Sequence, residues 1–157
     1  MKYANLLRRL LVIGAGTVSL GLLSPSVEAR SVGAVIGLAG SVDMPCLAIS
    51  LGTMANTCTR VISFDWPLVI DNAGAKTATV SGFGASSANN VGCKLQGANK
   101  QSTVVTYSNG GQYLFLPTFG QSADIVLTGV TVPPEGQLLV NCQISPGGRI
   151  DVVNWNP

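Results

Sequence analysis

Side chains able to perform acid–base or nucleophilic chemistry are few in this 157-residue chain. Histidine is absent, which excludes Ser-His-Asp and Cys-His catalysis and removes the commonest metal ligand. A glycosidase would need two facing carboxylates, and the candidates by residue type are Asp65, Asp71, Asp124, Glu135 and Asp151. These lie in turns, at strand starts or beside basic residues, so we interpret them as solvated carboxylates and predict no catalytic residue. A carboxylate-dependent, glycoside-active enzyme is the second alternative to the non-catalytic role that the rest of the sequence predicts.

The four cysteines predict disulfides rather than a metal site. They show no Cys-x-x-Cys spacing, and no histidine is present to complete a zinc site. Two disulfides are the simplest arrangement on an exported chain. Of the three pairings we favour Cys46–Cys58 with Cys93–Cys142, because the first pair closes a local loop. Asp71-Asn72 and Asn89-Asn90 supply too few acids for a dedicated calcium site. We therefore predict no metal and no cofactor.

Aromatic side chains give the clearest indication of a ligand. Secreted β-sandwiches often bind sugars by stacking them on exposed Trp or Tyr rings, with amides and carboxylates supplying hydrogen bonds. The candidate ligand-binding aromatics are Trp66, Tyr107, Tyr113 and Trp155. Tyr107 and Tyr113 flank Asn109-Gly110 and would equally stabilise a hairpin as a cross-strand pair. For the two tryptophans we favour packing in the core or at its rim.

The elements that position these residues are predicted to be strands. From Cys93 to Trp155 the chain is a run of short apolar segments separated by turns every 8 to 12 residues. Alternation predicts a strand over residues 137–144, with one face made of Leu138, Val140, Cys142 and Ile144. In the last strand, residues 149–155, both parities carry apolar residues and the inner face is ambiguous. The pattern indicates an all-β, single-domain antiparallel β-sandwich, jelly-roll or immunoglobulin-like, of about eight strands.

Local signals place further strands and turns. Asn109-Gly110 tolerates the positive φ angles of a type I′ turn, so residues 102–107 and 113–116 are predicted to pair as a hairpin. Residues 60–66 are predicted to form a strand halted by Pro67, and residues 45–59 a loop or short strand pair. Residues 30–43 alternate and predict a first strand. The alternative is a donor strand, residues 32–42, that inserts into a neighbouring subunit to assemble a surface polymer.

Residues 1–29 are predicted to be a cleaved signal peptide. Lys2, Arg8 and Arg9 precede an apolar core of 14 residues, Leu10 to Leu23, and Val27-Glu28-Ala29 suits cleavage. That core is shorter than the about 20 residues needed to span a bilayer. An uncleaved anchor is the alternative, and ordinary secretory export is favoured over the twin-arginine route. We expect residues 30–157 to be the β-sandwich domain, secreted or periplasmic, without a transmembrane segment.

The charge balance restricts the partners. Without residues 1–29 the chain keeps six basic and six acidic residues. This neutral balance supplies no electrostatic footprint for nucleic acid and argues against binding to acidic lipid. The sequence therefore predicts an exported, non-catalytic protein with a structural, adhesive or ligand-binding role in the cell envelope or outside the cell. Its expected partner is a carbohydrate or another envelope protein, and its oligomeric state is left open.

Overall fold

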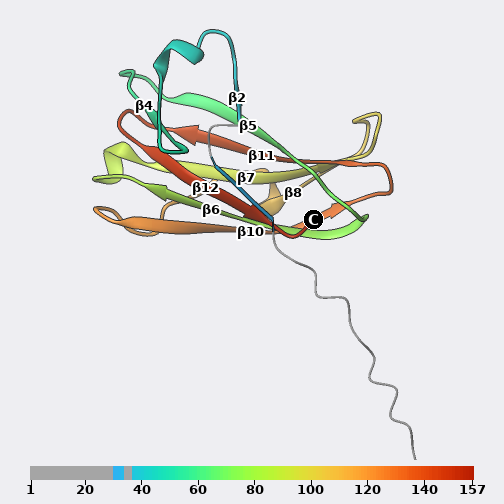
Figure 1. The fold of residues 1–157 in the computed structure, drawn as a ribbon. Coiled ribbons are helices and arrows are strands. Elements are labelled where there is room, and N and C mark those ends of the chain that lie inside the picture. Colours follow the sequence, from blue (N-terminus) through green and yellow to red (C-terminus); the bar gives the residue numbers. More distant parts are fainter. Residues whose placement is uncertain (1–29, 34–36) are drawn as a thin grey trace, which may run out of the picture.

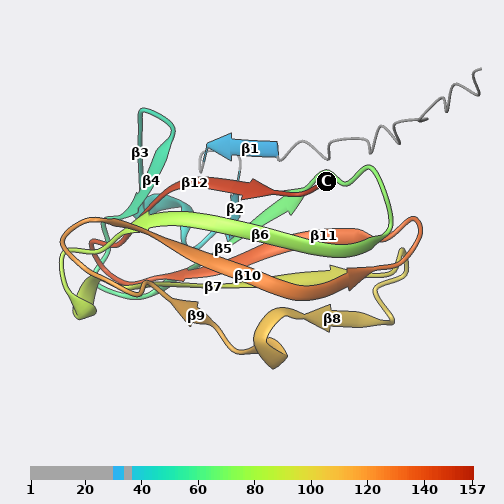
Figure 2. The same ribbon diagram turned by 90° about the horizontal axis from the view of Figure 1, so that it is seen from below.

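The computed structural model describes residues 30–33 and 37–157, so the predicted signal peptide lies outside the described residues. Two antiparallel sheets pack face to face (Figures 1 and 2). The prediction of an all-β sandwich is confirmed, with twelve short strands in the described ranges instead of about eight. No helix in these ranges is long and apolar enough to cross a membrane.

Sheet A has the strand order β10-β6-β12-β4-β3, and β1 also pairs with β12. Its strands are β1 (Arg30–Gly33), β3 (Leu47–Ser50), β4 (Thr53–Asn56), β6 (Gly74–Phe83), β10 (Ser122–Val132) and β12 (Arg149–Trp155). Sheet B has the order β2-β5-β11-β7-β8, and β9 also pairs with β7. Its strands are β2 (Leu38–Ala39), β5 (Ile62–Leu68), β7 (Val91–Ala98), β8 (Val105–Tyr107), β9 (Leu114–Phe115) and β11 (Gln137–Ile144). In the described ranges three short 3-10 helices interrupt the strands: η2 (Met44–Cys46), η3 (Ser87–Asn89) and η4 (Ser108–Gly111).

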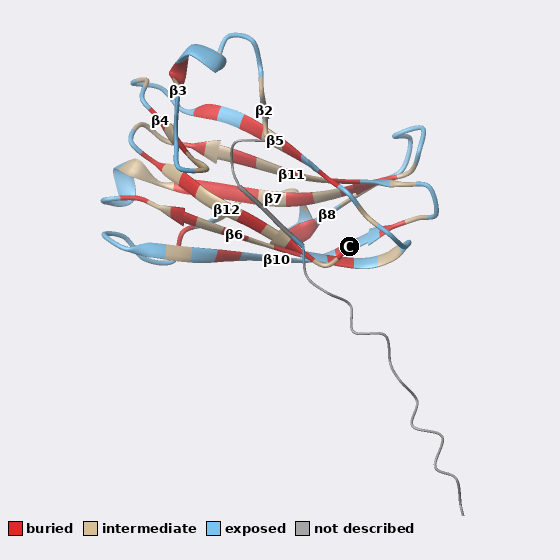
Figure 3. Ribbon diagram, viewed as in Figure 1, coloured by how far each residue is buried: buried red, intermediate tan, exposed pale blue. Residues whose placement is uncertain are grey.

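The core lies between the two sheets and is built by the period-two pattern of the strands. Every second residue of β11, from Leu138 to Ile144, is at most 1% exposed, as the sequence predicts. Phe64 and Trp66 of β5 face the same interior, with ring centroids 4.6 Å apart. Buried and exposed residues therefore alternate along the strands of both sheets (Figure 3).

Both predicted disulfides are confirmed. Cys93 of β7 and Cys142 of β11 are register partners in sheet B, and both are fully buried. The bond between them therefore joins neighbouring strands of one sheet. Cys46 and Cys58 close the segment that contains the β3–β4 hairpin, which confirms a short strand pair between residues 45 and 59.

The predicted hairpin around Asn109-Gly110 is wrong, although its turn conformation is right. Both residues have positive φ, 48° and 61°. However, β8 and β9 do not pair with each other, since each pairs with a different part of β7. The 3-10 turn η4 carries the chain onward along β7, so the two strands lie end to end (Figure 2).

Two strands differ from their predicted course for local backbone reasons. Strand β5 continues through Pro67, which pairs with Leu139 on β11. On its other side β5 pairs with β2 only at Asp65 and Phe64. Pro67 lies beyond that pairing, so the N–H group that proline lacks is not needed for any described hydrogen bond between β5 and β2. In β12 the register shifts between Ile150 and Val152. This irregularity switches the buried parity from Ile150 to Val153 and Trp155, which explains the ambiguous pattern of the sequence.

The two described parts of the N-terminal segment pair with different sheets. Strand β1 pairs with β12 of sheet A, and β2 pairs with β5 of sheet B. Gly37 lies so close to the rings of Phe64 and Trp66 that a Cβ there would overlap both. The described parts of the segment, residues 30–33 and 37–43, thus contact their own chain. Donor-strand exchange through residues 32–42 would require these contacts to open.

Candidate functional site

The outer surface of sheet B carries the candidate site, which we call the tyrosine face. It consists of Asp65, Lys94, Gln96, Tyr107, Tyr113, Asn141 and Gln143. The antiparallel register places Asn141 of β11 directly between Asp65 of β5 and Lys94 of β7. Two residues after Lys94 on the same strand β7, Gln96 lies opposite Tyr107 of β8. Strand alternation turns these side chains away from the core, so they form one continuous polar and aromatic surface.

A chain of hydrogen bonds fixes the centre of the tyrosine face. The Tyr113 hydroxyl donates to Oδ1 of Asn141, and Nδ2 of Asn141 donates to Oδ1 of Asp65 at 2.6 Å. Because both ends of the Asn141 amide are engaged, its orientation and that of the Tyr113 ring are set before any ligand arrives. Burial raises the pKa of Tyr113 above its usual 10.0, and the negative charge of Asp65 raises it further, while a hydrogen bond with Gln143 opposes them. The phenol therefore remains a neutral hydrogen-bond donor near neutral pH.

The Lys94 ammonium group lies near the rings of both Tyr107 and Tyr113, the two residues that the sequence predicted to face each other across a hairpin. Its Nζ lies 4.7 Å from the ring centroid of Tyr113 and 5.6 Å from that of Tyr107. Both distances are within the range of cation–π attraction. The ammonium group and the two rings thus form a single cluster at the edge of the Asn141 network.

The four aromatic candidates divide into two pairs. Trp66 is fully buried, and Trp155 is 7% exposed with its indole Nε1 donating to the Val69 carbonyl at 2.7 Å. Both rings pack in the core, and Trp155 lines a shallow pocket at the ends of β6 and β12 rather than the tyrosine face. Tyr107 is 41% exposed and Tyr113 is half-buried, both on the tyrosine face. The sequence did not single out Lys94, Asn141 or Asp65 as partners, although strand alternation in residues 137–144 already placed Asn141 outside the core.

The carboxylates have separate roles in the described part of the chain. Asp71, Glu135 and Asp151 each form an ion pair, with Arg30, Lys100 and Arg149 respectively. Asp124 accepts a hydrogen bond from Ser81 at 2.6 Å, and Asp65 belongs to the Asn141 network. Within residues 30–33 and 37–157, no three Asp, Glu or Cys side chains gather in a group that could hold a metal ion.

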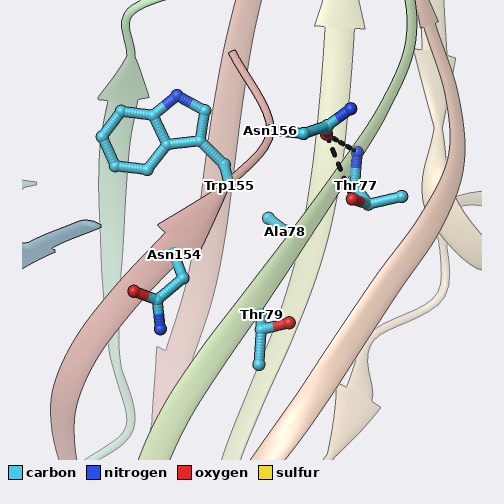
Figure 4. Close-up of a pocket in the computed structure, with 6 residues that line it drawn as sticks. All are labelled: Thr77, Ala78, Thr79, Asn154, Trp155 and Asn156. Carbon is cyan, nitrogen blue, oxygen red and sulfur yellow. Dashed lines mark hydrogen bonds between the residues drawn. The ribbon is translucent and has the colours of Figure 1, made fainter. Parts of the chain in front are cut away.

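Among the pockets of the described residues, two shallow ones lie away from the tyrosine face. One, of about 130 Å³, lies at the ends of β6 and β12 and is lined by Thr77, Ala78, Thr79, Asn154, Trp155 and Asn156 (Figure 4). Its polar groups partly satisfy each other, because Oδ1 of Asn156 accepts from the backbone N–H and the hydroxyl of Thr77. The other, of about 220 Å³, lies where the β5–β6 and β10–β11 turns meet, beside Asp71 and Glu135. Both are below the usual range of about 300–1,000 Å³ for a ligand cavity.

No protein-family model matches the chain, and no curated protein matches its sequence. Among solved structures, a GH26-CBM35 β-(1,4)-mannanase from Podospora anserina superposes with a TM-score of 0.54 at 9% identity, over 83% of this chain and 28% of the mannanase. TmCBM61, solved in complex with β-1,4-galactotriose, gives 0.44 at 12% identity over 85% of this chain and 87% of its own. The enzymatically active domain of tailspike protein 4 from bacteriophage CBA120 gives 0.47 at 8% identity over 82% and 19%. This chain spans about a quarter of the mannanase, and the likeness shows a shared fold over that part.

Proposed function

We propose that this protein is an exported, non-catalytic carbohydrate-binding protein that holds a glycan on the tyrosine face. The observation that carries the proposal is the cluster of Tyr107, Tyr113 and Lys94 beside the fixed Asn141–Asp65 pair on one exposed sheet surface. The fold similarity to part of a mannanase whose name includes a carbohydrate-binding module is compatible with this role.

The chemistry of the face suits a sugar. A pyranose ring has an apolar surface of C–H groups and a rim of hydroxyls, so it complements an aromatic ring flanked by hydrogen-bonding groups. Tyr107 offers the more exposed ring. The Gln96 amide, opposite it on β7, has no side-chain hydrogen bond to the described residues and is free to bind hydroxyls. A ligand would therefore meet an aromatic surface and open polar groups within one patch.

The proposed location is outside the cytoplasm, in the periplasm or the surrounding medium. Two disulfides suit an oxidising compartment, and the basic and apolar segment of residues 1–29 suits export. A protein that binds glycans would meet them there, in the cell envelope or outside the cell.

Affinity electrophoresis of the exported protein through gels containing different soluble polysaccharides tests this function. We expect at least one polysaccharide to retard the wild type, and Tyr107→Ala to reduce the retardation by about tenfold or more, since a central aromatic contact is worth well over 1.4 kcal/mol. Phe119→Ala is the matched control, because Phe119 is exposed to a similar extent but is not part of the tyrosine face. Equal losses in both variants, or no retardation by any polysaccharide, would contradict the proposal.

A further inference from the structure

The charges of the described residues leave one surface cation without an acidic partner. Residues 30–157 contain six basic side chains. Four of them contact a carboxylate, namely Arg30, Arg60, Lys100 and Arg149. Lys76 is 3% exposed and shares the inner parity of β6 with Ala78 and Val80. Lys94 is the remaining one, and it lies half-buried on the tyrosine face.

Aromatic rings hold the Lys94 ammonium in place but leave its donors available. The faces of Tyr107 and Tyr113 attract the positive charge, yet a ring is a poor substitute for an oxygen acceptor. Asp65 is the nearest acid by register, and it stands two strands away across Asn141, a spacing of about 10 Å between backbones. No ion pair joins Lys94 to Asp65 or to any other described acid. The position is thus preformed for an anionic acceptor supplied by a ligand.

The same geometry disfavours a neutral sugar over the Tyr113 ring. Such a sugar would need to displace the ammonium group from the ring face, which forfeits the cation–π attraction and gains no opposite charge. A sugar that carries a carboxylate would use the ammonium where it already lies. Asp65, on the opposite flank of Asn141, repels further negative charge, so the face suits a ligand with isolated carboxylates better than a densely sulfated polymer.

We infer that the glycan bound on the tyrosine face is a uronate-containing polysaccharide whose carboxylate pairs with Nζ of Lys94. This inference rests on the proposed carbohydrate-binding function. The sugar lies with its acidic edge over β7 and its hydroxyl edge toward Asn141 and Asp65 of β11 and β5. Lys94 selects for the acid, while Tyr107 and the amides bind the ring that carries it.

Matched polysaccharides measure how much the carboxylate of the ligand contributes to binding. Affinity electrophoresis compares polygalacturonate and alginate with their methyl esters, which keep the sugar and the linkage and remove the charge, and with carrageenan as a sulfated polymer. The protein variants are Lys94→Met, which keeps the apolar stem, and Lys94→Arg, which restores the charge. Lys100→Met is the control, because Lys100 is an exposed cation paired with Glu135 and is not on the face.

We expect the wild type to bind at least one uronate polymer about tenfold more tightly than its ester, with a preference that weakens between about 20 mM and about 200 mM salt. Lys94→Met should lose that preference, Lys94→Arg should retain most of it, and Lys100→Met should keep it fully. Equal binding of acid and ester, an unaffected Lys94→Met variant, or tighter binding of carrageenan would overturn the inference and leave the proposed function standing. Failure to bind any polysaccharide would remove the proposed function together with this inference.

Discussion

Removing the two disulfides one at a time should destabilise the protein unequally. The Cys93–Cys142 bond closes a sequence separation of 49 residues and is fully buried between β7 and β11. The Cys46–Cys58 bond closes a separation of 12 residues beside the β3–β4 hairpin, and Cys58 is only half-buried. The double variants Cys93→Ala/Cys142→Ala and Cys46→Ala/Cys58→Ala remove each crosslink without leaving free thiols.

The size of each loss follows from loop closure and burial. In the chain-entropy treatment, the longer loop contributes about 4 kcal/mol and the shorter one about 3 kcal/mol. Loss of the buried sulfurs of Cys93 and Cys142 adds a cavity cost of about 1–2 kcal/mol. In the other pair only Cys46 is buried, so the added cost there is about 0.5–1 kcal/mol. We therefore expect about 5–6 kcal/mol for the β7–β11 bond against about 3–4 kcal/mol for the other. A domain of this size is stable by about 5–15 kcal/mol, so the first variant approaches the limit of folding.

Urea unfolding monitored by the fluorescence of the two buried tryptophans, Trp66 and Trp155, measures both losses. Removing one crosslink lets the unfolded chain expand, so the free energy of unfolding should fall more steeply with urea concentration. The change should be larger for Cys93→Ala/Cys142→Ala, which opens the longer loop. A Cys46→Ala/Cys58→Ala variant that loses as much stability as the Cys93→Ala/Cys142→Ala variant would refute this ranking of the two bonds. An unchanged dependence on urea in both variants would refute the role of loop closure.

Three further changes test the core and the tyrosine face. Lys76→Met should leave the unfolding free energy within about 0.5 kcal/mol of the wild type, because it keeps the buried apolar stem and Lys76 forms no ion pair with the described residues; a change in melting temperature of more than a few degrees in calorimetry would contradict this. Trp155→Phe removes the indole donor to the Val69 carbonyl and should cost about 1–2 kcal/mol in urea unfolding while glycan binding persists; lost binding would place Trp155 in the site. Stability should fall as pH rises above 10.0, since a raised folded pKa of Tyr113 means that its contribution is complete below the unfolded pKa and is lost as pH passes the folded one. Absorbance at 295 nm should show that this loss and one late-titrating phenol both vanish in Tyr113→Phe, and a phenol titrating at the ordinary value would contradict it.

Alternation and cysteine spacing predicted the parts of the fold that depend on local sequence. In β11 every second residue is apolar, and the strand with its buried face could be placed correctly from residues 137–144 alone. Cys142 lies on that same face, so its burial opposite a second cysteine is consistent with the pattern. The strand β12 had the right bounds but an unreadable inner face, because the irregularity after Ile150 adds a residue that period-two alternation cannot anticipate.

The remaining features, the pairing of β8 and β9 and the make-up of the tyrosine face, depended on which strands pair with each other. The turn at Asn109-Gly110 adopts the positive φ angles that its residues favour, but a local signal does not decide whether the two flanking strands pair with each other or with a third. Since both pair with β7, Tyr107 and Tyr113 meet over a lysine of β7 instead of across a hairpin. Lys94 and Asn141 carry no sequence signature, and only the register of β7, β11 and β5 brings them beside the tyrosines.

The register of β5 also connects the tyrosine face with the N-terminal segment. Asp65, which anchors the Asn141 amide, pairs through its backbone with Leu38 of β2. Gly37, just before that pairing, rests on the core rings of Phe64 and Trp66 where no Cβ would fit. A side chain at Gly37 would push β2 away from β5 and loosen Asp65 at the same time. Strand β2 therefore has two roles. It covers the core rings of Phe64 and Trp66, and through β5 it holds Asp65, which is one end of the hydrogen-bond chain that orients Tyr113 on the tyrosine face.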